Sequence, residues 1–134
     1  MDELYLGNYK KFESIKQIDE NGCEFWYARE LMNALEYKRW DKFNNVINNA
    51  KLACEKSNNI VEDHFSHVGK MVEIGSKTSR KISDYKLSRY ACYLIVQNAD
   101  PSKEVVALGQ TYFAIQTRKQ EIFVKEYESL SEDE

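Results

Sequence analysis

A single proline, Pro101, interrupts a chain that is otherwise free to form long helices. The 134 residues include only five glycines, and no segment has the low complexity of a linker. Helices tolerate glycine and proline least, so their scarcity favours more helix than strand. A chain of this length buries roughly two-thirds of its unfolded surface, which is enough for a core without disulfides or metal. The hydrophobic content of 43% argues against disorder.

Apolar residues recur at three- and four-residue steps along much of the chain, which is typical of amphipathic helices. The clearest series runs from Trp40 through Phe43 and Ile47 to Cys54. Ser88 precedes another series and is a suitable N-cap. Residues 60–67 fit no clear pattern, and a short helix is one interpretation. The predicted helices cover residues 9–18, 28–37, 39–56, 88–98 and 103–130.

Two segments have the composition of β-structure. Cys23–Ala28, CEFWYA, is rich in aromatic residues and follows a turn signal at residues 20–22. Lys70–Ile74 has the alternating side-chain pattern of a strand. A turn at Gly75–Ser79 and a second strand at Arg80–Leu87 follow it, which predicts a hairpin. We therefore expect an α+β fold that is mainly helical, with a small antiparallel β-hairpin unit and a long C-terminal helix.

The last predicted helix is long for a domain of this size. At ~28 residues it extends about 40 Å, which is more than such a domain can cover. We divide the chain into a domain of residues 1–102 and a long helix with an acidic tail, residues 103–134. The distal helix presents apolar residues among acidic ones, and we expect these to bind a partner: Ile122, Phe123, Tyr127 and Leu130. The simplest partner is a second copy in a two-fold homodimer. Lys119 interrupts the apolar face of this helix, which predicts a short helical contact and not a long coiled coil.

The charge of the chain is unevenly distributed. The formal net charge is −3, yet residues 69–90 contain six basic and two acidic residues. Because a polyanion responds to the local field, this segment is a candidate nucleic-acid contact. The alternative is a solvated hairpin whose charges only maintain solubility. The candidate contacts are Lys77, Arg80, Lys81, Lys86 and Arg89.

Metal binding and catalysis have little support. Asp63, His64 and His67 form a D-H-x-x-H cluster, and both histidines share a face only if the segment is helical. No third ligand is evident nearby, so we expect no metal. The sequence contains no G-x-S-x-G, P-loop or G-x-G-x-x-G motif, so we expect neither a cofactor nor an enzyme.

The cysteines and the apolar segments indicate a cytoplasmic protein. Cys23, Cys54 and Cys92 are odd in number and far apart, which argues against a disulfide framework. No apolar run approaches the ~20 residues needed to span a bilayer. The N-terminus lacks a basic start followed by an apolar run, so we expect no signal peptide and no membrane partner.

Long strings of the sequence resemble the bacterial DNA-damage-inducible protein D family. They lie within residues 12–121 and include EFWYARELMNALEYKRWDKFNNVI, DHFSHVGKMVEIGS, LSRYACYLIVQNADPSK and YFAIQTRKQE. That family is related to the wider Bro-N class of phage antirepressor and viral DNA-binding domains. Its members are usually longer, so this chain is either a short member or lacks a second half.

The resemblance implies a non-enzymatic regulatory module of the DNA-damage response that contacts DNA or a DNA-bound protein through the basic hairpin. The second hypothesis is a protein-interaction or dimerisation module that modulates a recombinase or repressor without touching DNA. The third is a nuclease-like enzyme, which the absence of a recognisable catalytic pattern disfavours.

Overall fold

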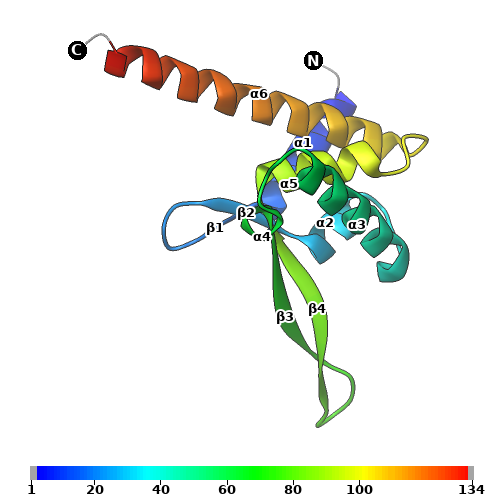
Figure 1. Cartoon of the computed structure of the whole chain (residues 1–134). Helices are drawn as coiled ribbons and strands as arrows, with labels where there is room; N and C mark the ends of the chain where they lie inside the picture. Colours follow the sequence, from blue (N-terminus) through cyan, green and yellow to red (C-terminus); the bar gives the residue numbers. More distant parts are fainter. Residues whose placement is uncertain (1–2, 133–134) are drawn as a thin grey trace.

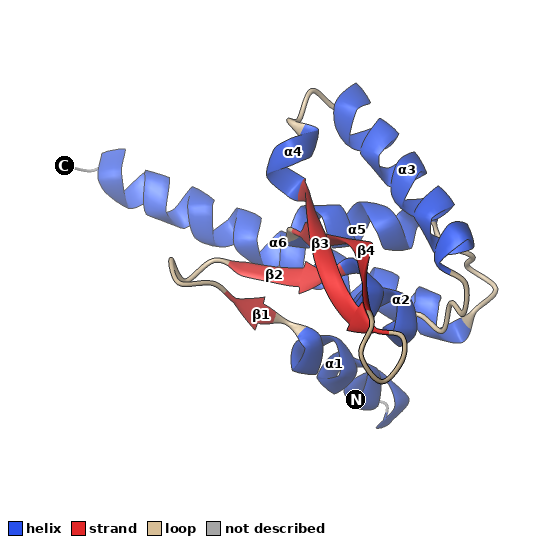
Figure 2. Ribbon diagram, turned by 90° about the horizontal axis from the view of Figure 1, so that it is seen from below, coloured by secondary structure: helices blue, strands red, loops and turns tan. Residues whose placement is uncertain are grey.

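The computed structural model describes residues 3–132 and confirms the α+β class (Figures 1 and 2). Six helices and four strands occur within that range. Their order is α1 (Glu3–Ile15), β1 (Gln17–Ile18), β2 (Glu24–Tyr27), α2 (Ala28–Ala34), α3 (Trp40–Lys56), α4 (Val61–His64), β3 (Phe65–Glu73), β4 (Ser79–Leu87), α5 (Arg89–Asn98) and α6 (Glu104–Glu132).

The strands form one antiparallel sheet in the order β1-β2-β4-β3. The predicted unit of an aromatic strand and a basic hairpin is therefore confirmed. β2 joins the hairpin near its base, where Trp26 pairs with Leu87. β3 and β4 pair continuously from Phe65 and Leu87 to Glu73 and Ser79. Figure 1 shows the outer part of this hairpin extending away from the helices.

The core lies where the sheet base meets the helices. Trp26 is fully buried, its indole nitrogen donates to the Phe12 carbonyl over 3.1 Å, and its ring contacts Phe113 edge-on. One face of α2 and one face of α3 are buried as well: Ala28, Leu31 and Ala34 in α2, and Phe43, Ile47, Ala50 and Cys54 in α3. Burial of these large side chains supplies most of the driving force for folding, at about 1.5–3 kcal/mol each.

The first predicted helix has the wrong bounds, because α1 begins at Glu3 and ends three residues early. Residues 9–18 were expected to be helical, but α1 ends at Ile15 and Ile18 lies in β1, 60% exposed. The reason is the turn that follows. The Asp19 carboxylate accepts hydrogen bonds from the backbone of Asn21 and Cys23, and Gly22 adopts a φ of 79°. This turn folds β1 back onto β2.

The segment 60–67 is only partly helical. α4 is a single turn that ends at His64, and β3 then begins at Phe65, five residues before the predicted strand. Phe65 is buried and pairs with Leu87, so cross-strand pairing extends the strand into the core. His64 and His67 consequently do not share a helix face.

The long C-terminal helix is confirmed as α6. Its first part packs on the core, with Val106, Tyr112 and Phe113 buried. Every described side chain from 118 to 130 is exposed, and Figure 1 shows this part of α6 extending beyond the other helices. Within residues 3–132, no helix combines the length and the apolar composition that crossing a membrane requires.

Candidate nucleic-acid interface

The outer part of the β3–β4 hairpin, residues 69–83, is called the arm. None of its side chains is buried, and only Val72 and Ile82 are partly covered. The arm carries four basic residues, Lys70, Lys77, Arg80 and Lys81, against one acidic residue, Glu73. Its tip is closed by a hydrogen bond from the Ile74 backbone N–H to the Thr78 carbonyl over 3.0 Å. The arm is thus a cationic ribbon surrounded by solvent.

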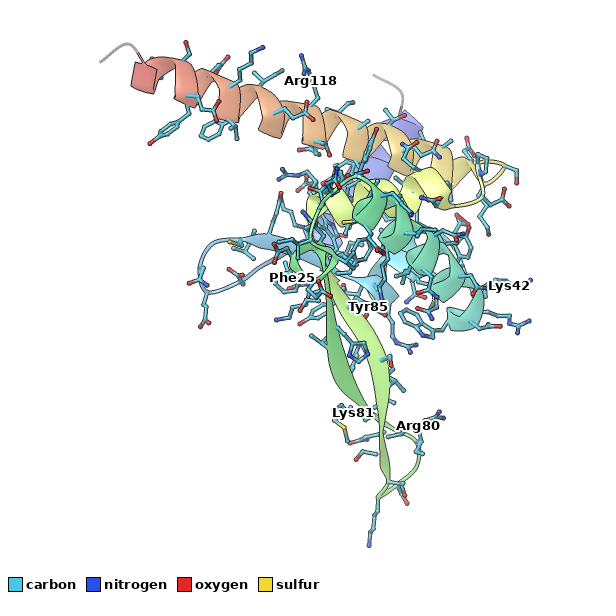
Figure 3. The ribbon with its side chains drawn as sticks, viewed as in Figure 1. Phe25, Lys42, Arg80, Lys81, Tyr85 and Arg118 are labelled. Carbon is cyan, nitrogen blue, oxygen red and sulfur yellow. The ribbon has the colours of Figure 1, made fainter. Side chains whose placement is uncertain are left out.

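The strand register divides these cations between two faces. Arg80 and Lys81 are consecutive in β4, so they point to opposite sides of the arm, as Figure 3 shows. Lys70 stands opposite Ile82, and Arg80 stands opposite Val72, on the same face as Lys86. Lys70, Arg80 and Lys86 are called the basic face. Sequence reasoning had omitted Lys70 from this set, because its face depends on a register that only the paired strands reveal.

Lys81 and Lys77 lie outside the basic face. Lys81 pairs with Met71 on the other side, and its methylene stem lies across Gly69, where a side chain would collide with it. Lys77 occupies the exposed turn at the tip. Both side chains remain exposed, so the structure leaves their charges in contact with solvent.

The remaining two candidates lie near the body. The Lys86 ammonium is exposed and sits 5.0 Å from the centre of the Phe25 ring. Arg89 begins α5, is 20% exposed and forms an ion pair with Glu24. Burial lowers the pKa of this guanidinium from its usual value. The structure therefore separates Arg89 from the arm cations with which the sequence had grouped it.

The base of the arm is fixed by polar contacts to α2. Asp84 is 1% exposed, and its carboxylate accepts hydrogen bonds from the backbone N–H groups of Arg29 and Tyr85 over 3.0 and 2.8 Å. The Arg29 side chain donates to the Ser83 carbonyl over 2.7 Å and stacks on Trp40, 4.1 Å from the ring centre. These contacts orient the arm relative to the domain.

A second set of contacts joins the other face of the base to α3. The Lys51 ammonium donates a hydrogen bond to the Tyr85 hydroxyl over 2.6 Å and lies 4.2 Å from the centre of the Tyr85 ring. Tyr85 is labelled at the base of the arm in Figure 3. His67 packs edge-on against the same ring, with centroids 5.4 Å apart. The arm base is therefore held on both faces, and the outer arm is free to meet a ligand.

The histidine cluster does not assemble. His64 Nδ1 lies 2.7 Å from Ser88 Oγ, which accepts a hydrogen bond from the Ala91 N–H as the predicted N-cap of α5. His67 instead belongs to the arm base. Among the residues that the structure describes, no group of three His, Cys, Asp or Glu side chains is arranged to hold a metal.

The cysteines lie in different environments. Cys54 and Cys92 are buried, and Cys23 is exposed in the β1–β2 turn. Burial raises the pKa of both buried thiols. A raised pKa leaves less of the nucleophilic thiolate at neutral pH, so Cys54 and Cys92 act as small core residues.

A known protein family matches most of the chain. The profile of the N-terminal domain of the BRO family matches residues 14–114, which include α2 to α5, the whole sheet and the first part of α6. This chain belongs to the BRO family. Its Bro-N domain thus contains the arm and both elements that hold the arm base.

One relative that is similar in sequence is a bacterial protein. The chain is 51% identical over 128 residues to DNA damage-inducible protein D of Escherichia coli strain K12. The match covers 95% of this chain and 47% of the relative, so the Bro-N chain spans about half the relative's length. The resemblance seen in the sequence is confirmed. No solved structure matches the chain.

Proposed function

We propose that this Bro-N domain is a non-enzymatic regulatory module of the bacterial DNA-damage response, and that its arm contacts DNA. The similarity to a DNA damage-inducible protein supports a role in the DNA-damage response. The observation that carries the DNA contact is the arm itself. The arm carries four exposed basic side chains on a solvent-exposed ribbon, although the chain as a whole has a negative net charge.

The arm has the chemistry of a phosphate-binding element. Exposed lysine and arginine side chains position a protein on the nucleic-acid backbone without reading its sequence. A two-stranded ribbon is also narrow enough to enter the major groove of B-form DNA. We assign the contacts to Lys77, Arg80, Lys81 and Lys86, and add Lys70 because it shares a face with Arg80. We leave Arg89 out because Glu24 already pairs with it.

Alanine substitution of the arm tests this function. Changing Lys77, Arg80 and Lys81 together should weaken binding to a DNA duplex by at least tenfold at low salt, because three phosphate contacts are lost. The control changes one arginine and two lysines that are also exposed but lie outside the arm: Lys56, Arg118 and Lys125. Equal affinities of the two triple variants would refute the assignment, because net charge alone would then explain binding.

A protein-interaction module is the second candidate, and a specific observation favours it. The distal part of α6 exposes large apolar side chains, with Phe123 at 65% and Leu130 at 70% exposure. A second copy of the chain or another protein bound there would bury them. This role and DNA contact use different ends of the molecule, so the two candidates are tested separately.

A further inference from the structure

Four exposed apolar side chains of distal α6, those of Ile115, Ile122, Phe123 and Leu130, follow one stripe, whereas Tyr127 borders this stripe and Val124 lies on the opposite side of the helix. A helix has about 3.6 residues per turn, so residues three, four and seven apart share a face. Six exposed residues along the centre of this stripe are called the seam: Ile115, Lys119, Ile122, Phe123, Glu126 and Leu130. The seam thus has an apolar centre, a charge of opposite sign on each side of it, and an apolar residue at each end.

We propose that the seam binds the seam of a second copy in an antiparallel pair, with the two-fold axis between Ile122 and Phe123. Antiparallel pairing then sets Ile122 of each chain level with Phe123 of the other. One step outward, Lys119 comes level with Glu126 of the second copy. At each end, Ile115 comes level with Leu130. Every seam residue therefore meets a complementary one, and the same contacts occur twice, as a closed two-fold interface requires.

Charge excludes the parallel alternative. Two parallel copies in register would place Lys119 against Lys119 and Glu126 against Glu126, which is repulsive in both cases. The antiparallel pair turns both repulsions into attractions. Lys119 had been interpreted as an interruption of the seam. In this arrangement it fixes direction and register, as a polar group between apolar layers does in coiled coils.

The proposal rests on the proposed partner-binding role of distal α6 and is independent of DNA contact by the arm. Loss of DNA affinity in the arm variant with dimerisation intact would remove only the DNA function. A monomeric wild-type chain with arm-dependent DNA binding would remove only the dimer.

Charge reversal provides the test, with sedimentation equilibrium as the measurement and far-UV circular dichroism to confirm that each variant stays helical. Lys119→Glu and Glu126→Lys should each weaken dimerisation on the order of tenfold or more, because each places two like-charged pairs in the interface. The double variant Lys119→Glu/Glu126→Lys should restore it. Mixing the two single variants should also restore it, because the heterodimer again pairs opposite charges.

Glu128→Lys is the matched control, since it makes the same charge change as Glu126→Lys on the opposite side of the helix, at an exposed residue, and should leave dimerisation unchanged. A wild-type chain that stays monomeric at the highest concentration reached would overturn the proposal and assign this face to a different protein. Single variants that dimerise as tightly as wild type, or a double variant that dimerises no better than the single ones, would overturn the register.

Discussion

Asp84 shows how a single residue determines where the arm points. Its sequence neighbours suggested one more charge on a solvated hairpin, yet the carboxylate is buried between β4 and the start of α2. It accepts hydrogen bonds from two backbone N–H groups, of Arg29 and Tyr85. A buried donor left without an acceptor costs about 1–3 kcal/mol. Asp84 thus couples the orientation of the arm to the stability of the domain.

Substituting this residue should have a graded effect. Asp84→Ala removes the acceptor for both N–H groups and should lower the free energy of unfolding by about 2–4 kcal/mol. Asp84→Asn keeps an acceptor oxygen at the same place and should lower the free energy of unfolding by about half as much or less. Urea unfolding followed by circular dichroism measures both values. Equal losses for the two variants would show that the hydrogen bonds are not what stabilises this site.

At the scale of elements, the arm and the body should be energetically separate. Residues 70–82 contain no buried side chain, whereas Asp84, Tyr85 and Leu87 below them are buried. Replacing residues 71–81 with a two-residue Asn-Gly turn joins Lys70 to Ile82 and preserves the base. We expect the melting temperature to change by less than about 5 °C, because little apolar surface is lost. A shortened chain that fails to fold cooperatively would show that the arm contributes to the core.

The sequence predicted elements well where one helix or strand carries its own pattern. The Trp40–Lys56 helix and the Ser88 cap were found because periodicity and capping are local signals. The two-residue strand β1 and the early start of β3 were missed, because each forms only by pairing with a partner strand. The separation of Arg80 and Lys81 onto two faces likewise depends on the register.

At the scale of the whole molecule, the candidate site was only partly predictable. The basic residues of the arm could be recognised from the local composition of residues 69–83 alone. The ion pair of Arg89 with Glu24 does not, because it joins the start of α5 to β2, which are distant in sequence. The resulting arrangement places a basic arm and an acidic helix end on different parts of one small domain. A polyanion is therefore attracted to one end and repelled by the other.

The salt dependence of DNA binding shows whether the cations of the arm contact phosphates. Affinity for a DNA duplex is measured across a salt series for the wild-type chain and for the variant with Lys77, Arg80 and Lys81 changed to alanine. Each phosphate contact contributes about 0.9 to the slope of log affinity against log salt. We predict a steep slope for the wild-type chain and a slope for the variant that is shallower by roughly 2–3. Identical slopes, or no binding by the wild-type chain at low salt, would contradict this prediction.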